Sequence, residues 1–310
     1  MTILVAADFD APQWAAWHGA LAAALRSETF VRSAAHGDAT IDVAFVANPP
    51  VGALAGLPAL RLVQSLWAGV DRLLADASVP AHLPIARMVD PAMNDAMAQT
   101  ALWAVLTLHR DHIRYARQQA ERVWRQWPQR RADEVHVLVL GLGEMGRTCA
   151  RRLADNGYRV SGWSTRAASL PGIVTHAGGD ALDGVLAEAD IVVNLLPLTD
   201  ATRGFFDART YARMKAGSAL VNLARGAHVV EADLMAALDS GHLAHAVLDV
   251  YASEPLPAAH PFWTHPRITV LPHVAAQTDP RSAAQIAARN VRALRAGAPL
   301  EHLVDRQRGY

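Results

Sequence analysis

The fold is decided by residues 135–146, which read VHVLVLGLGEMG. The first six are almost wholly apolar, as is typical of a strand buried on both faces of a parallel sheet. The glycine pattern G-x-G-x-x-G follows this strand directly and opens a helix. Its glycines permit a tight turn, a close approach of a pyrophosphate to the backbone, and close packing of helix on strand. The stretch therefore predicts a dinucleotide-binding loop made of Gly141, Leu142, Gly143, Glu144, Met145 and Gly146.

Apolar segments continue on both sides of this loop. After it, we expect strands at 159–163, 191–195, 219–223, 246–250 and 268–271. Before it, strand-like segments lie at 3–6, 43–46, 62–65 and 85–88, with a helix at 12–25. Strands that alternate with helices indicate parallel sheets. We therefore predict an α/β protein with two Rossmann-like domains built on doubly wound parallel sheets.

Two further segments read as long helices. Met93–Arg122 contains neither glycine nor proline and predicts one helical stretch, with Asn94 or Asp95 as its cap. A last helix is expected from about Pro280 to Ala296, crossing back to the first domain.

Composition narrows the class of protein. The 310 residues include 29 basic and 29 acidic side chains, so the net charge is zero and nucleic acid is not an expected partner. A single cysteine, Cys149, excludes an internal disulfide framework and fits a reducing cytoplasm. We see no basic leader, no apolar run long enough to span a membrane, and no zinc-ligand spacing among the histidines. The sequence therefore favours a cytoplasmic protein without a metal site.

The end of the second strand of the nucleotide-binding domain bears on the choice of cofactor. An NAD site usually places an acidic residue there to hold the ribose hydroxyls. This chain instead has Ser164, Thr165 and Arg166. Hydroxyls and a guanidinium suit a 2′-phosphate, which arginine binds through two parallel hydrogen bonds. We therefore predict that NADP(H) is preferred over NAD(H).

Three residues near the ends of later strands predict a reducing chemistry. Reduction of a 2-oxo acid needs a cation that addresses the carboxylate and the carbonyl, and Arg225 suits this role. It also needs a proton donor, for which a histidinium such as His273 is apt near neutral pH. A carboxylate beside that histidine, for which Glu254 is the candidate, would orient its ring and raise its pKa.

These motifs together resemble the D-2-hydroxyacid dehydrogenases, in particular the bacterial glyoxylate/hydroxypyruvate reductases. The resemblance covers nearly the whole chain and rests on the phosphate loop and on many ordered matches. They include 48–50 (NPP), 68–71 (AGVD), 163–164 (WS), 194–197 (NLLP), 222–226 (NLARG), 236–241 (AALDSG), 254–257 (EPLP), 272–276 (PHVAA) and 308–310 (RGY).

The resemblance implies a role for each motif. Arg225 would bind and orient substrate, Glu254 would pair with the proton donor His273, and Asp249 would hold the nicotinamide carboxamide. The substrate carboxylate would be gripped by backbone N–H groups of Ala68, Gly69 and Val70. Further residues of the cofactor groove would be Leu196, Pro197, Thr202, Leu223, Ala224 and Ala275.

The resemblance also implies an organisation. Residues 1–98 plus 276–310 would form a flavodoxin-like substrate-binding domain, and 99–275 the dinucleotide-binding Rossmann domain. The active site would lie in the cleft between them. A homodimer is implied, with the helical stretch after Met93 at its interface.

Two positions depart from the family pattern. Ala47 stands where relatives carry an aromatic residue, and Trp67 stands where they tend to have glycine. One hypothesis is that Trp67 replaces the lost aromatic wall and reshapes the substrate pocket. The alternative is that it packs beneath its loop.

The expected activity is thus NADPH-dependent reduction of a small 2-oxo acid, such as glyoxylate or hydroxypyruvate. Two other functions stay open on the same fold: a dehydrogenase of a larger 2-hydroxy acid, and a dinucleotide-sensing regulatory protein. The intact trio of Arg225, Glu254 and His273 argues against the sensor, because a sensor need not keep a proton donor.

Overall fold

Two parallel β-sheets organise the chain, and each belongs to its own compact unit. The computed structural model describes residues 2–310. The first unit comprises the chain up to Met93 together with Thr278–Tyr310, and the second comprises Asn94–Gln277. The prediction of an α/β fold with parallel sheets is confirmed.

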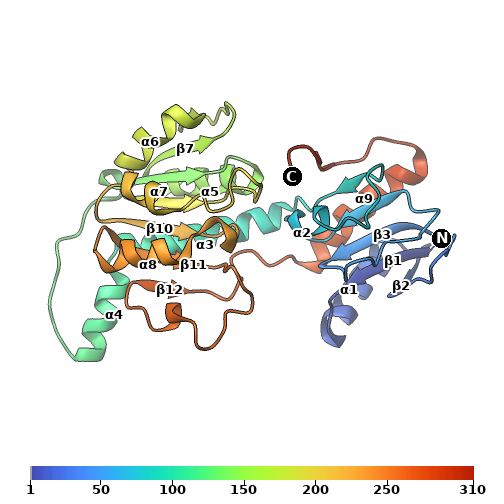
Figure 1. Cartoon of the computed structure of the whole chain (residues 1–310), viewed down its shortest axis with the longest axis horizontal. Helices are drawn as coiled ribbons and strands as arrows, with labels where there is room; N and C mark the ends of the chain where they lie inside the picture. Colours follow the sequence, from blue (N-terminus) through green and yellow to red (C-terminus); the bar gives the residue numbers. More distant parts are fainter. Residues whose placement is uncertain (1) are drawn as a thin grey trace. The chain divides into compact units, whose positions relative to one another are not determined.

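The first unit holds a five-stranded sheet with the order β2-β1-β3-β4-β5, and all of its pairings are parallel. Helices α1 (Ala11–Ala24) and α9 (Pro280–Ala296) pack against one face and bury an aromatic and alanine-rich core with it. In Figure 1 these are the blue and red helices beside that sheet. The short helix α2 (Asp71–Leu74) follows β4. The strands are β1 (Thr2–Ala7), β2 (Thr29–Val31), β3 (Ile41–Ala47), β4 (Leu62–Ser65) and β5 (Ile85–Ala86).

The second unit holds a seven-stranded parallel sheet with the order β12-β11-β10-β9-β6-β7-β8. The chain runs outward from β6 in one direction through β7 and β8, and in the other through β9 to β12. Such a reversal beside the first strand is where α/β folds bind ligands. The strands are β6 (His136–Leu140), β7 (Arg159–Ser164), β8 (Val174–Ala177), β9 (Ile191–Asn194), β10 (Ser218–Asn222), β11 (Leu243–Leu248) and β12 (Ile268–Val270).

Helices cover both faces of this sheet. One face buries α3 and α5 and the other buries α6, α7 and α8, each against its own apolar cluster. None of the helices within residues 2–310 is long and apolar enough to cross a membrane. The helices are α3 (Pro91–His109), α4 (His112–Glu121), α5 (Glu144–Asp155), α6 (Gly179–Glu188), α7 (Ala208–Arg213) and α8 (Glu231–Asp239), with 3₁₀ turns at Ala132–Glu134, Gly226–His228 and Pro261–Trp263.

The long helix expected over Met93–Arg122 is two helices. The break falls at Asp111, whose φ of 56° is left-handed, a conformation that aspartate tolerates better than most residues. The predicted caps are also wrong, because the helix begins at Pro91 and the Asp90 carboxylate accepts the Ala92 N–H at 2.9 Å. Proline in the first turn already lacks a free N–H, so the cap lies before it.

Two strands were not expected from the sequence. β2 (Thr29–Val31) and β8 (Val174–Ala177) each lie at one edge of a sheet. Neither contains a fully buried residue. An edge strand that is only half covered needs no continuous apolar run, so the pattern that reveals central strands is missing.

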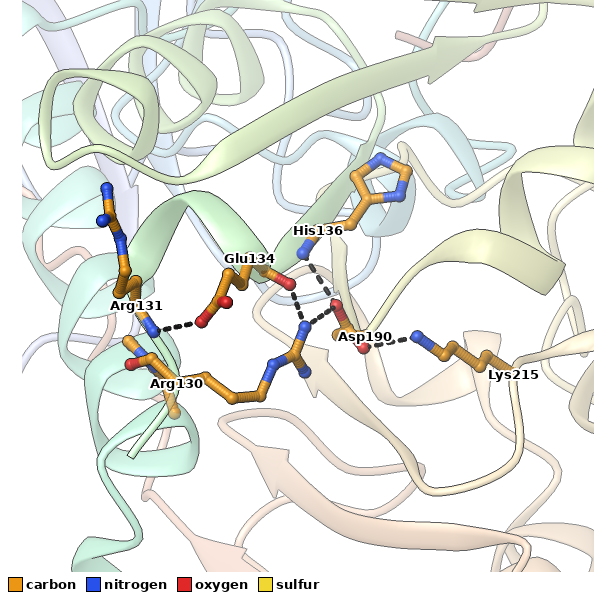
Figure 2. Close-up of polar contacts among 7 residues, drawn as sticks. Arg130, Arg131, Glu134, His136, Asp190 and Lys215 are labelled. Atoms are coloured by element: carbon orange, nitrogen blue, oxygen red, sulfur yellow. Dashed lines mark hydrogen bonds and ion pairs between the residues drawn. The ribbon is translucent and has the colours of Figure 1, made fainter. Parts of the chain in front are cut away.

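A cluster of charged side chains connects the amino ends of the central strands in the second unit. The Asp190 carboxylate accepts the His136 N–H at 2.8 Å, Arg130 Nη2 at 3.0 Å and Lys215 Nζ at 2.7 Å (Figure 2). Burial opposes ionisation, but the bonds from Arg130, from the His136 N–H and from Lys215 hold the pKa of Asp190 well below its usual range. The carboxylate thus joins the segments that lead into β6, β9 and β10.

Candidate active site

The glycine turn that the sequence predicts to bind phosphate lies between β6 and α5. Gly141 has a φ of 92°, and its N–H donates to Trp163 O at 2.8 Å, which fixes the turn at the end of β6. A Cβ added at Gly146 would lie 1.8 Å from Gly141 O, so only glycine lets α5 start this close to the strand. The first turn of α5 directs backbone N–H groups and the positive end of the helix dipole outward. This arrangement suits a phosphate group.

The turn after β7 carries the three residues that are expected to favour NADP(H) over NAD(H). The Ser164 hydroxyl donates to Arg166 O at 2.6 Å and closes the turn, while Thr165 and Arg166 are exposed. Trp163 anchors the end of the strand through its indole N–H, which donates to Gly178 O at 2.8 Å. The guanidinium of Arg166 therefore stands on a turn that is fixed at both ends.

A buried amide pair shapes the loops after β9 and β10. Asn194 Nδ2 donates to Asn222 Oδ1 at 2.9 Å, and both side chains are fully buried. Asn194 Oδ1 accepts the Leu196 N–H at 3.2 Å, and Asn222 Nδ2 donates to Arg225 O at 3.0 Å. The sequence alone predicts no role for these two asparagines. Two polar residues that end otherwise apolar strands were the available signal.

Other residues expected in the cofactor groove also lie at the carboxyl ends of the strands. Thr202 turns inward, and its hydroxyl donates to Pro197 O at 2.7 Å, which closes the loop after β9. Leu223 and Ala224 are buried directly after β10. The loops that hold these residues follow adjacent parallel strands, so they lie next to one another at the carboxyl edge.

Arg225 stands at the tip of the β10 loop. Its Nη1 donates to Ala224 O at 2.7 Å, and its carbonyl is held by Asn222. The next residue must be small, because a Cβ at Gly226 would lie 1.9 Å from the carbonyl carbon of Tyr251. The β10 loop therefore packs directly on the backbone of the loop that follows β11.

Glu254 and His273 meet across two loops. His273 Nδ1 lies 2.8 Å from Glu254 Oε2, and Glu254 Oε1 accepts the Tyr251 N–H at 2.9 Å. The pair occupies loops that follow β11 and β12, and the Glu254–Pro255 peptide is cis. Because Nδ1 is engaged with the carboxylate, Nε2 is the ring nitrogen that can present a proton outward.

Asp249 holds the turn that carries the histidine. Its carboxylate is 1% exposed and accepts the N–H groups of Val274 at 2.7 Å and Ala275 at 3.0 Å. Its carbonyl accepts the His273 N–H at 2.9 Å, and His273 has a left-handed φ of 53°. Burial raises the pKa of Asp249 in spite of the two N–H donors.

The electrostatics of the pair favour a charged imidazole. The hydrogen bond to Glu254 raises the pKa of His273 above its usual value, although burial and Arg225 act the other way. Burial alone would raise the pKa of Glu254, but the bonds from His273 and from the Tyr251 N–H lower it. A histidinium beside a carboxylate is suited to donate a proton to a reacting oxygen near neutral pH.

The expected substrate-binding segment, Trp67 to Val70, belongs to the first unit and links β4 to α2. The Trp67 ring is partly buried and packs edge-on against Phe9 and Trp17, with centroids 6.1 and 5.9 Å apart. Its carbonyl accepts the Ser65 hydroxyl at 2.8 Å. The tryptophan thus extends an aromatic cluster beneath the loop.

Comparisons with known proteins find one family over most of the chain. Residues 102–275 match the family model of the D-isomer specific 2-hydroxyacid dehydrogenase, NAD binding domain. The chain is 36% identical over 274 residues to a glyoxylate/hydroxypyruvate reductase A of Yersinia enterocolitica. The aligned region covers 87% of this chain and 88% of that protein. A Photorhabdus laumondii protein of the same name is 40% identical over 275 residues, again covering 87% and 88%.

Solved structures give the same result. A D-isomer specific 2-hydroxyacid dehydrogenase from Xanthobacter autotrophicus Py2, in complex with NADPH and MES, superposes with a TM-score of 0.94 at 39% identity, covering 100% of this chain and 99% of that one. An NADPH-dependent glyoxylate/hydroxypyruvate reductase from Sinorhizobium meliloti, in complex with NADP and sulfate, gives 0.93 at 34% identity with the same coverage.

The His273–Glu254 pair generates a prediction that needs no enzyme assay. In Glu254→Gln the ring loses its anionic partner, so the pKa of His273 should fall. The measurement is an NMR titration of the His273 Cε1–H resonance, assigned with His273→Asn. Glu231→Gln, which changes the carboxylate 3.3 Å from His260, is the matched control and should leave His273 unmoved. An unchanged titration in Glu254→Gln would contradict the pairing.

Proposed function

The chain belongs to the D-isomer specific 2-hydroxyacid dehydrogenase family, and we propose that it reduces glyoxylate or hydroxypyruvate with NADPH, with His273 as the proton donor. It is therefore an NAD(P)-dependent oxidoreductase of 2-hydroxy and 2-oxo acids. The observation that carries the proposal is the 2.8 Å contact between His273 and Glu254 at the same sheet edge as the phosphate loop.

The proposed chemistry divides between cofactor and protein. The nicotinamide, when bound, supplies a hydride to the carbonyl carbon of the 2-oxo acid. His273 gives its Nε2 proton to the carbonyl oxygen. The C–H bond of the 2-hydroxy acid takes the hydride's electron pair, and the O–H bond takes the pair of the C=O π bond. Glu254 keeps the histidine charged until that step and fixes its ring. Arg225 offsets the charge that develops on the oxygen and orients the substrate carboxylate.

The residues that would hold the dinucleotide fit such a group. The glycine turn after β6 and the first turn of α5 supply backbone N–H donors for the pyrophosphate. Asp249 and Ala275 would border the nicotinamide, and the loop from Leu196 to Thr202 would line the groove. On the substrate side, we assign the carboxylate to backbone N–H groups of Ala68, Gly69 and Val70.

The preference for NADPH is supported by the turn after β7. Arg166 is exposed there, and Ser164 fixes the turn by donating to Arg166 O. No acidic side chain lies between Arg159 and Arg166 to accept the ribose hydroxyls of NADH. The two structural relatives described above hold NADPH and NADP. A guanidinium at this position would pair with the 2′-phosphate.

A panel of 2-oxo acids tested with each cofactor examines the activity. We expect the highest kcat/KM with NADPH and either glyoxylate or hydroxypyruvate, at least about tenfold above the value with NADH, because one charged contact is worth about 1.5–3 kcal/mol. The rate of reduction should fall as pH rises through the raised pKa of His273, since the protonated donor is lost. A higher kcat/KM for NADH, or for larger 2-oxo acids, would overturn that part of the proposal.

The matched control for the cofactor part is Arg166→Ala compared with Arg151→Ala, an exposed arginine on α5. Arg166→Ala should lower kcat/KM with NADPH and leave kcat/KM with NADH unchanged, whereas Arg151→Ala should alter neither value.

Trp67 is proposed to shape the substrate side. The Trp67 ring belongs to a cluster with Phe9 and Trp17. Trp67→Gly should therefore have two effects: it removes one wall of the proposed substrate pocket, and it loosens the aromatic cluster. We expect the ranking of 2-oxo acids to shift toward larger ones by about tenfold in relative kcat/KM, since pocket volume discriminates on that scale. Trp17→Phe, which disturbs the cluster alone, is the control. A uniform loss for all substrates in both variants would leave Trp67 only a packing role.

We also propose a homodimer held through the second unit. Helix α4 has no buried residue, and the segment that follows it exposes Val123 by 46% and Trp124 by 95%. On α3, Trp103 and Leu106 are 42% and 41% exposed. A ten-residue helix with no buried residue is marginal in water, so a second copy of the chain is the expected cover.

Sedimentation equilibrium tests the dimer. We expect the native protein to sediment as a dimer and Trp124→Ser to raise the dissociation constant by at least about a hundredfold, as truncating a buried aromatic anchor does. Trp263→Ser changes a tryptophan that is 49% exposed elsewhere on the unit and should leave the dimer intact. A native monomer would refute the assembly.

The proposed compartment is the cytoplasm. Cys149, the single cysteine, is buried, and burial raises its pKa to about 12. The thiol therefore stays protonated and is unreactive. Nothing in the chain's cysteine usage calls for an oxidising environment.

A further inference from the structure

One tyrosine touches all three segments that carry the catalytic trio. Tyr251 lies three residues beyond the end of β11, and its side chain is 7% exposed. Its ring packs against Phe262, with centroids 6.4 Å apart. Neither the cofactor loop nor the proposed proton transfer uses this residue directly, so its polar contacts need a separate account.

The backbone of Tyr251 contacts two of those segments. Its N–H donates to Glu254 Oε1 at 2.9 Å, which leaves Oε2 to face His273. Its carbonyl carbon lies where a Cβ on Gly226 would come within 1.9 Å, directly beside Arg225. The main chain of this one residue therefore orients the carboxylate and supports the arginine loop.

The hydroxyl of Tyr251 contacts the third segment. It lies 2.7 Å from Leu248 O and 2.9 Å from Leu271 O, the carbonyl two residues before His273. Leu248 O already accepts the Leu271 N–H at 2.8 Å. Burial raises the pKa of Tyr251 far above its usual range, so the hydroxyl stays protonated and remains a donor at every working pH.

We propose that Tyr251 is a positioning residue: its hydroxyl holds the strand end at Leu271 and so sets the approach of His273 to Glu254. The proposal rests on the proposed function for its kinetic consequence, but not for its structural one. A hydroxyl can bridge the ends of β11 and β12, which phenylalanine cannot do. Without it, the Leu271 carbonyl loses a buried donor and the Pro272–His273 turn gains freedom.

The charge on the histidine reports this positioning. Three charged groups act on its ring: Glu254 and Asp249 raise its pKa, and Arg225 lowers it. Of these, the hydrogen bond to Glu254 is the strongest influence and depends most steeply on geometry. Loosening the turn should therefore lower the pKa of His273 toward that of an isolated histidine, and the protonated donor should be lost at a lower pH.

Tyr251→Phe tests the proposal, with Tyr211→Phe as the matched control. The Tyr211 hydroxyl is buried and has no hydrogen-bond partner among residues 2–310, so its removal takes away a phenolic oxygen without breaking a bond. Both changes keep the ring, and circular dichroism checks that both variants are folded. The readouts are the NMR titration of His273 in the protein without substrate, and kcat and KM for glyoxylate with NADPH from pH 6 to 9.

In Tyr251→Phe we expect the His273 pKa to fall and the high-pH limb of kcat to move to lower pH with it. At pH 8, kcat should fall about tenfold while KM changes less than twofold, because misplacement of a proton donor is felt in the transition state. Tyr211→Phe should match the native protein in every readout. A His273 titration that Tyr251→Phe leaves unchanged, or an equal shift in both variants, overturns the proposal.

The two failures are distinguishable. If the native protein does not reduce glyoxylate but Tyr251→Phe still shifts the His273 titration, the proposed function fails and the positioning role stands. If the native protein is active and the titration does not move, the function stands and Tyr251 is only a packing residue.

Discussion

The buried carboxylate of Asp249 is the constraint on which the candidate site depends. It accepts two consecutive N–H groups, from Val274 and Ala275, while its own carbonyl accepts the N–H of His273. These three bonds hold the backbone of His273 in a left-handed conformation that residues other than glycine seldom adopt. A turn fixed in this way points the ring at Glu254. Burying the carboxylate is tolerated because both of its oxygens are hydrogen-bonded.

The two edges of the seven-stranded sheet divide the work of the second unit. At the edge where the strands begin, Asp190 gathers Arg130, Lys215 and the His136 N–H into a fixed cluster (Figure 2). At the opposite ends of the strands, the neutral pair Asn194 and Asn222 joins the loops after β9 and β10, and the Asp249 carboxylate joins the loops after β11 and β12. Arg225, Glu254 and His273 lie on these loops. Fixing the amino ends of the strands provides a stable support for the loops at their carboxyl ends, where the candidate site lies.

The balance of forces on His273 explains why a paired histidine suits this position. Burial lowers its pKa and a neighbouring carboxylate raises it, and the carboxylate prevails. The side chain remains 53% exposed in the described chain, so one nitrogen is bound by Glu254 while the ring stays accessible. A fully buried pair would face a larger desolvation cost and would be out of reach of a substrate.

Local elements can be predicted from the amino-acid sequence: the apolar run and glycines of 135–146, the helix 280–296, and most central strands follow from hydrophobic periodicity and turn chemistry. The family is also recognisable, because many short motifs occur in one order. The sequence did not reveal the break at Asp111, the edge strands β2 and β8, or the roles of Asn194, Asn222 and Tyr251. Those features depend on strand register and on which loops meet at one edge of a sheet. Glu254 and His273 are 19 residues apart in the chain and 2.8 Å apart in space. That proximity results from the parallel pairing of β11 with β12, a contact between segments distant in the chain that local sequence patterns do not specify.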